Sequence, residues 1–268
     1  MFSCRMTDAS LLKKVLEALR DLVEDANIDC NETGLSIQAM DASHVALVCL
    51  NLDQKAFDKY VCDSSVTLGV NIGSIQKIIK CGESSDILTL QNDSDSSNLK
   101  FTFENGSDRH FEFSMSLMDI DSERLAVPDF ETTVTIKMPS AELQKICRDL
   151  TQFGDTVKIT VQKGQVTFSV AGATTKGSLI LSSVDLQVPE GSVDDNSKKI
   201  TKNDVDVELS FALRYLNFFT KAAPLSDNVE LVLTADRPLI VRFHLNDGNG
   251  KIQYYLAPKV DENDENNE

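Results

Sequence analysis

Apolar residues recur at helical spacing in four segments of the chain, and short stretches of alternating apolar and polar residues follow each segment. In the first segment the apolar positions are 12, 15, 16, 19, 22 and 23, which predicts an amphipathic helix with Ser10 as its N-cap. Residues 28–31 and 35–38 then alternate with period two around a turn at 32–34, which predicts a β-hairpin.

The same order of elements is predicted three more times. Helices are predicted at 75–80, 143–148 and 213–219, and strands follow them at 87–90 and 99–103, at 157–161 and 166–170, and at 229–233 and 239–243. The aligned residues Leu12, Ile75, Leu143 and Leu213 lie 63, 68 and 70 residues apart in turn, so one repeat is present four times. Three copies read apolar-x-Lys-apolar-apolar, whereas the fourth has Tyr215 in place of the lysine.

The repeats predict an α+β fold with two similar domains. Each repeat is one helix plus strands joined by short turns, which favours antiparallel sheets with the helices on one face. Two repeats form one domain, so we expect an N-terminal domain at 1–117, an extended connector at 118–134, a C-terminal domain at 135–260 and a disordered acidic tail at 261–268. Residues 189–206 are polar and acidic and are predicted to form a surface loop.

Positive charge is concentrated on the predicted helices. The net charge of −16 argues by itself against nucleic-acid binding, which depends largely on neutralising phosphates. For one helix, an ordinary charged solvent face is the better explanation of its basic residues, but four equivalent basic helices in an acidic chain favour a common cationic surface. No row of base-reading Arg, Asn and Gln is present, so the expected contact is with nucleic-acid phosphates, independent of sequence. The expected DNA-facing residues are Lys13, Lys14, Arg20, Lys77, Lys80, Lys145, Arg148, Arg214 and Lys221.

The sequence contains no recognisable catalytic or cofactor site. Residues 172–177 have the glycine spacing of a phosphate loop, but Ser178 stands where a lysine is required. The histidines (His44, His110 and His244) lack metal-ligand spacing, and the six cysteines lack a Cys-x-x-Cys pair and are predicted to be reduced, buried apolar residues. With no signal peptide and no apolar run of ~20 residues, we expect an intracellular binding or scaffolding protein without enzymatic activity, cofactor or membrane partner.

Long stretches of the chain resemble the eukaryotic DNA sliding-clamp family, the proliferating cell nuclear antigens. The similar stretches are residues 12–19, 40–45, 77–81, 146–150, 211–222 and 254–259. The resemblance implies a nuclear ring of three identical subunits that encircles DNA, with the helices lining the hole and the sheets forming the outer wall. It also implies an ATP-dependent clamp loader, and partners such as replicative DNA polymerase, flap endonuclease and DNA ligase. These partners carry a peptide of the form Gln-x-x-aliphatic-x-x-aromatic-aromatic.

Site residues follow from the same resemblance. The partner-peptide groove of the family falls on Met40, His44, Val45, Leu47, Leu125, Val127, Pro128, Pro238, Ala257 and Pro258. The edge strands that join subunits fall on Phe111, Phe113, Met115 and Leu117 and on Gly177, Leu179 and Leu181. Lys163 is similar to the lysine that receives ubiquitin in the family, although by itself it is an ordinary turn lysine.

The chain departs from the family pattern in three places, and two other functions stay open. Thr132 stands where an aromatic residue is usual, Arg237 where an apolar residue is common, and the loop at 189–206 is longer and more acidic. A checkpoint-type clamp subunit would share the fold but assemble with different chains. A divergent hydrolase with an unrecognised acidic site is the alternative from another class.

Overall fold

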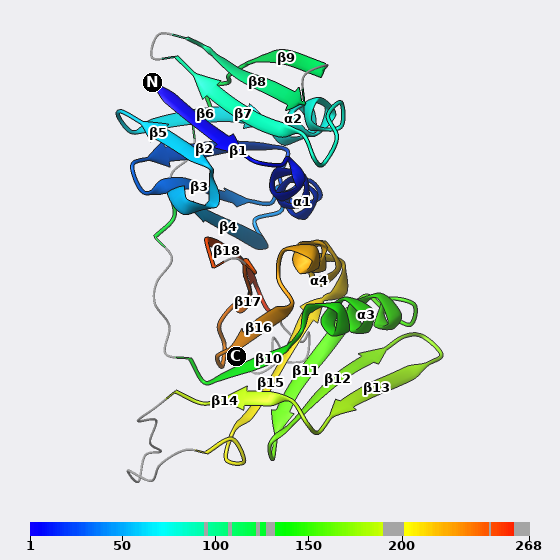
Figure 1. Ribbon diagram of the computed structural model, residues 1–268. Helices are drawn as coiled ribbons and strands as arrows, with labels where there is room; N and C mark the ends of the chain where they lie inside the picture. Colours follow the sequence, from blue (N-terminus) through cyan, green and yellow to red (C-terminus); the bar gives the residue numbers. More distant parts are fainter. Residues whose placement is uncertain are drawn as a thin grey trace. The chain divides into compact units, whose positions relative to one another are not determined.

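The structure, a computed structural model, describes residues 1–93, 96–106, 109–121, 124–126, 132–189, 201–246 and 248–259, and it divides into two compact units (Figure 1). Unit 1 comprises residues 1–126 and 244–253, and unit 2 comprises residues 127–243 and 254–268. The sequence predicts that the first domain ends at residue 117 and that residues 244–253 belong to the second domain. These latter residues belong to unit 1 because they contact its strands, for example through the Asp53 amide, which donates to the Asn249 carbonyl at 2.9 Å.

Unit 1 combines two helices with antiparallel strands. Its elements are β1 (Phe2–Met6), α1 (Ser10–Leu19), β2 (Asp25–Asn31), β3 (Gly34–Met40), β4 (Ala46–Asp53), a 3₁₀ turn (Gln54–Ala56), β5 (Lys59–Cys62), β6 (Val66–Asn71), α2 (Ile72–Ile79), β7 (Ile87–Asn92), β8 (Asn98–Asn105) and β9 (Arg109–Ser116). One sheet has the order β5-β1-β7-β8-β9, and in a second sheet β4, β3, β2 and β6 are neighbours in that order.

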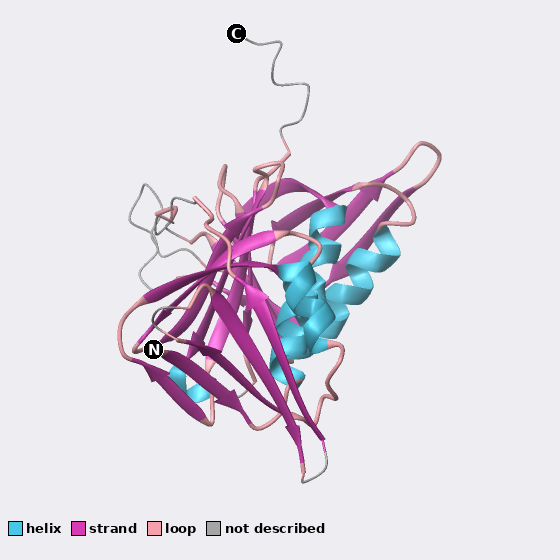
Figure 2. Ribbon diagram, turned by 90° about the horizontal axis from the view of Figure 1, so that it is seen from above, coloured by secondary structure: helices cyan, strands magenta, loops and turns pink. Residues whose placement is uncertain are grey.

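Unit 2 repeats this combination. Its elements are β10 (Val134–Pro139), α3 (Ser140–Leu150), β11 (Thr156–Gln162), β12 (Gln165–Ala171), β13 (Lys176–Leu181), β14 (Asp185–Gln187), β15 (Asp206–Ala212), α4 (Leu213–Phe219), a 3₁₀ segment (Thr220–Leu225), β16 (Asn228–Leu233), β17 (Leu239–His244) and β18 (Gly250–Leu256), the last two of which extend into unit 1. The strand orders are β13-β12-β11-β15 and β14-β10-β16-β17. Within each unit the helices cover one face of the strands (Figure 2), so the predicted α+β class is confirmed.

All four predicted helices are present, and one predicted cap is wrong. Ser10 is the first residue of α1 and does not cap it; the carboxylate of Asp8 accepts the Ser10 amide at 2.9 Å instead. In α2 the preceding Asn71 caps the helix by accepting the Ser74 amide at 2.9 Å. No helix among the described residues is long and apolar enough to cross a membrane.

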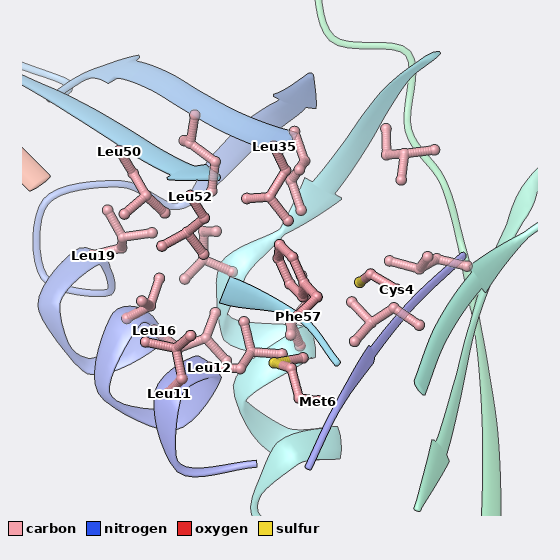
Figure 3. A pocket seen from close by; sticks show the side chains of 18 of the residues that line it. Cys4, Met6, Leu11, Leu12, Leu16, Leu19, Leu35, Leu50, Leu52 and Phe57 are labelled. Atoms are coloured by element: carbon pink, nitrogen blue, oxygen red, sulfur yellow. The ribbon is translucent and has the colours of Figure 1, made fainter. Parts of the chain in front are cut away.

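The core of unit 1 lies between α1 and the strands that it covers. Leu16 and Leu19 of α1 point toward Leu50 of β4, and Cys4 and Phe57 complete the lining of a small cavity (Figure 3). The cavity holds about 40 Å³ and its lining is apolar, so it offers an ordered water no set of polar partners. We attribute it to imperfect packing and not to a ligand site.

The core of unit 2 is built around aromatic residues. Phe219 stacks on Tyr254 with ring centroids 4.4 Å apart, and Phe243 meets the same tyrosine edge-on at 6.3 Å. Tyr254 is completely buried, and this burial raises the pKa of its phenol. These contacts fix α4 against β17 and β18.

Candidate functional site

Glutamines at equivalent repeat positions link the helical segments within each unit. Gln76 of α2 donates from Nε2 to Glu17 of α1 at 3.2 Å, and Gln144 of α3 donates from Nε2 to the Thr220 carbonyl after α4, also at 3.2 Å. Each glutamine directly follows the aligned apolar residue of its repeat. The repeat seen in the sequence therefore extends to the polar contacts that hold neighbouring helices.

The lysine that the first three repeats share faces solvent in every copy. Lys14, Lys77 and Lys145 are exposed, and none of them has an ion pair or a side-chain hydrogen bond within the part of the chain that the structure describes. Lys80 has the same environment, one turn beyond Lys77. Arg148 is 68% exposed, and within the described residues its ion-pair partner is the adjacent Asp149, at 3.5 Å. These five cations are available to an anionic ligand.

The other basic residues predicted to face DNA make contacts within the chain. Lys13 donates from Nζ to the Gly82 carbonyl at 2.8 Å and thereby holds the loop that follows α2. Arg20 pairs with Glu17 at 2.9 Å, and Arg214 lies 4.7 Å above the ring of Tyr215. Lys221 is half-buried in the 3₁₀ segment after α4. A contact of any of the nine residues with DNA stays a prediction.

A carboxylate organises the turn between β3 and β4. Asp41 is 7% exposed, and its carboxylate accepts the backbone amides of Val45 at 2.8 Å and Ala46 at 2.7 Å, and that of Ser43 at 3.1 Å. His44 is exposed at the tip of this turn with φ 56°, in the left-handed region. The turn thus presents His44 and the half-buried Val45 in one fixed arrangement.

The described residues 117–121 and 124–126 cross strands of unit 1 and are held at β6, β2 and β3 in turn. At β6, the Met118 amide donates to the Gly69 carbonyl at 2.8 Å. At β2, Asn27 donates from Nδ2 to the Ile120 carbonyl at 2.9 Å. At β3, the side-chain amide of Gln38 donates to the Leu125 carbonyl at 3.0 Å and accepts the Leu125 amide at 2.7 Å. We call this stretch the crossing segment.

An ion pair adds to these backbone contacts. Arg124 of the crossing segment lies 3.7 Å from the carboxylate of Asp29 on β2 and 3.4 Å from the hydroxyl of Ser36 on β3. Arg124 and Asp29 also line a polar groove of about 440 Å³ between the segment and β6. The described part of the predicted connector, residues 118–134, contains a single bridge between Gly69 and Met118 and, at its end, Val134, which is the first residue of β10.

The predicted groove residues fall in different parts of the structure. Met40 and Leu47 are register partners on β3 and β4 of unit 1, where the exposed Leu125 is also found. Pro238, Ala257 and Pro258 belong to unit 2, as do Thr132, which is half-buried, and Arg237, which is exposed. Val127 and Pro128 lie outside the described residues, as does the predicted tail at 261–268. The groove as a whole stays a prediction.

The two strands predicted to join subunits are sheet edges. β9 and β13 each end a sheet, and their apolar side chains are half-buried at alternate positions. Phe113 meets Phe103 of β8 edge-on at 6.3 Å, and Leu179 is the register partner of Phe168 of β12. Leu117 lies just beyond β9, where its amide donates to the Ser97 carbonyl. The unpaired edge of such a strand can accept a strand of another copy.

Lys163 lies at the exposed turn between β11 and β12. Gln162 and Gln165 are register partners, so Lys163 and Gly164 form a two-residue turn with φ values of 51° and 76°.

The described residues contain no group of three or more His, Cys, Asp or Glu side chains that could hold a metal ion.

Sequence reasoning missed the residues that hold the crossing segment. Gln38 and Leu125 are 87 positions apart, and Asn27 and Ile120 are 93 apart, so no local pattern could connect them. A signal was available at Gly69, a glycine inside a strand, which often marks a close backbone approach. A Cβ at this position would overlap the Met118 carbonyl oxygen.

Comparison with known families gives two matches. The N-terminal domain model of proliferating cell nuclear antigen matches residues 1–124, and the C-terminal domain model of the same family matches residues 126–259. The boundary between the matches falls at residue 125, within the crossing segment.

Proposed function

The chain belongs to the proliferating cell nuclear antigen family, and from this membership we propose that it is a homotrimeric DNA sliding clamp that encircles duplex DNA as a polymerase processivity factor. The observation that carries the proposal is the set of exposed, unpaired lysines at equivalent repeat positions: Lys14, Lys77 and Lys145. In a chain of net charge −16, these helices are the surfaces suited to phosphates.

The ring retains DNA by enclosure and not by affinity. Isolated ammonium groups make phosphate contacts that exchange readily and are screened over ~8 Å at physiological salt. The acidic remainder of the chain disfavours DNA binding from outside the ring. Closure comes from pairing of the edge strand β9 of one copy with β13 of the next, which is supported by the unpaired edges of both strands.

Partners bind as peptides at the groove beside the turn that Asp41 organises. Met40, His44, Val45, Leu47 and Leu125 are the expected groove residues that belong to unit 1. Aromatic anchors of the peptide supply most of the binding energy. Through this groove the clamp tethers DNA polymerase, flap endonuclease, DNA ligase and similar proteins in the nucleus, without catalytic activity or cofactor. A closed ring cannot thread circular DNA, so an ATP-dependent loader opens it.

The test loads the protein onto nicked circular DNA with a clamp loader and ATP, and then follows its retention. We expect it to stay on circles as the salt concentration rises and to leave when the DNA is cut to a linear form. Dissociation from intact circles at high salt would contradict enclosure. In solution the protein should have about three times the 29.6 kDa mass of one chain. A monomer that assembles only with other chains would instead support the checkpoint-type clamp, and metal-dependent hydrolysis of DNA would support a nuclease.

Charge-reversal variants test the helical lysines. We expect the triple variant Lys14→Glu, Lys77→Glu, Lys145→Glu to load about tenfold less, because each lost phosphate contact weakens the complex. The matched control reverses Lys59, Lys100 and Lys137, which are exposed on strands other than β9 and β13 and change the net charge equally. Equal loss in both variants would show that the helices have no special role.

A further inference from the structure

Gln38 occupies the junction between the crossing segment and the groove residues of unit 1. Asn27 pairs with Gly69 across β2 and β6, and Gln38 pairs with Cys49 across β3 and β4. Asn27 and Gln38 flank the Ile28–Ile37 pair of the β2–β3 ladder, so all four residues form one row across the sheet. The crossing segment follows this row from Met118 at Gly69 to Leu125 at Gln38.

The groove residues begin at the next position on the same face. Met40 is two residues beyond Gln38 on β3, and its partner Leu47 is two residues before Cys49 on β4. Side chains two apart on a strand share a face. Gln38 is therefore the last contact of the segment before Met40 and Leu47, and Leu125 is itself an expected groove residue.

The contact between Gln38 and Leu125 is specific in both directions. Nε2 donates to the carbonyl at 3.0 Å, and Oε1 accepts the amide at 2.7 Å, so one side chain satisfies both backbone groups of one residue. No other uncharged side chain of this length carries a donor and an acceptor together; a glutamate keeps the acceptor and loses the donor, and a methionine of similar shape loses both. The amide thus sets both the position and the direction of the backbone at Leu125.

From this geometry we infer that Gln38 is a positioning residue for partner binding, which fixes the Leu125 backbone so that the groove exists before a peptide arrives. The inference rests on the proposed peptide groove. A peptide that meets a fixed wall loses less free energy to ordering it than a peptide that must immobilise the wall on binding. Gln38 would then govern affinity without being a residue that the peptide touches.

The experiment measures binding and backbone protection in the full chain. The probe is a synthetic fluorescent peptide of the form Gln-x-x-aliphatic-x-x-aromatic-aromatic, followed by anisotropy. We expect Gln38→Met to weaken binding about tenfold, the factor that corresponds to roughly two ordinary hydrogen bonds. Hydrogen exchange should become faster at residues 124–126, while exchange in β3 and β4, the melting temperature and the oligomeric state stay as in the wild type.

Two further variants sharpen the comparison. Gln38→Glu keeps an acceptor for the Leu125 amide and removes only the donor, and we expect it to weaken binding about threefold or more, since one hydrogen bond is lost. Gln91→Met is the matched control: Gln91 is a half-buried glutamine on β7 whose amide donates to Asp93 at 2.9 Å, away from the crossing segment. We expect this control to bind the peptide like the wild type.

The possible outcomes separate the inference from the proposed function. Unchanged affinity of both Gln38 variants, beside a wild type that binds, overturns the inference and leaves the groove intact. Weaker binding that comes with faster exchange throughout β3 also overturns it, because the effect would then be general unfolding. A wild-type protein that does not bind the probe at all contradicts the proposed groove itself.

Discussion

The six cysteines differ in burial: three are buried, Cys49 and Cys62 are half-buried, and one is exposed. Cys4 and Cys147 are buried, which raises the pKa of each thiol to about 12, and burial also raises the pKa of Cys30. These three fit the expectation of reduced apolar residues. Cys81 does not, because it lies two residues beyond the end of α2 and is exposed. A protonated, enclosed thiol reacts slowly, so alkylation of the folded protein should begin at Cys81.

Because the pKa of Cys147 is raised, the loss of folding stability caused by replacing this cysteine should depend on pH. Below pH 9, the pKa of this thiol in the unfolded chain, the protonated thiol contributes its full stabilisation of the folded state. This stabilisation is lost as the pH rises toward about 12, the pKa in the folded state. Cys147→Ala should lower the free energy of unfolding at pH 7.5 by about 1–2 kcal/mol through lost packing. At pH 10 the deficit should be about 1 kcal/mol smaller, because the wild type loses stability there and the variant does not. Urea unfolding at both pH values measures the difference.

The exposed thiol provides the control for this measurement. Cys81→Ala should differ little from the wild type at either pH, because it removes no buried contact. A Cys147→Ala deficit that is the same at pH 7.5 and pH 10 would contradict the assigned effect of burial.

At the scale of elements, the helices are the elements that the sequence predicts best. α4 has the predicted bounds, 213–219, and α3 extends the predicted 143–148 at both ends. α2 begins three residues before the predicted 75 and ends one residue before 80, and α1 ends at Leu19, before the predicted apolar positions 22 and 23. Their apolar stripes are local, so a single sequence contains them in full. The Lys163–Gly164 turn was equally visible, because glycine permits the positive φ that such a tight hairpin needs.

The turn predicts a stabilising substitution. Lys163 has φ 51°, a conformation that asparagine tolerates better than lysine, so Lys163→Asn should raise the free energy of unfolding by about 0.5 kcal/mol. Gly164→Ala should lower it by about 1 kcal/mol or more, because φ is 76° and the added Cβ would lie 2.7 Å from Oδ1 of Asn203. Chemical denaturation measures both, and Gly73→Ala in α2 serves as control, since its φ is not positive and its Cβ would meet nothing closer than 3.4 Å. Equal effects at both glycines would exclude turn geometry as the cause.

Elements that lack local periodicity were not predicted from the residues. β4 is buried at three successive positions, Ala46 to Val48, so its sequence shows no alternation. The edge strands β9 and β13 were located only through the resemblance to known clamps. The hydrogen bonds that hold the crossing segment could not be predicted from the sequence, because each joins residues about 90 positions apart in the chain. Predicted contacts with DNA, with partner peptides and between subunits stay predictions.

At the scale of the whole molecule, two units with the same plan each present one apolar edge strand. β9 closes a sheet of unit 1 and β13 closes a sheet of unit 2. One chain therefore has one edge of each kind, and head-to-tail pairing of unlike edges generates a closed ring when the rotation between copies permits it. Ile180 on β13 is 58% exposed in the single chain, which also favours a covering neighbour.

Gly177 separates assembly from folding. Within one subunit a side chain at this position has room, because the nearest atom to an added Cβ is 3.8 Å away. On the edge strand β13, however, a larger side chain would obstruct a neighbouring copy. Gly177→Val should therefore shift the protein from trimer toward monomer at micromolar concentration, as measured by sedimentation, while the unfolding of the dissociated subunit changes little. If the variant stayed trimeric at the same dilutions as the wild type, this would argue against β13 as the strand that joins subunits.

The solitary ammonium groups of Lys14, Lys77 and Lys145 have a consequence for movement. No carboxylate among the described residues pairs with them, so in the proposed ring each could leave one phosphate for the next by rotating its own side chain, and the ring would need to break no rigid contact to advance. The energy profile along the duplex is then shallow. Travel of the clamp would be limited by hydrodynamic drag, with little friction from the protein surface.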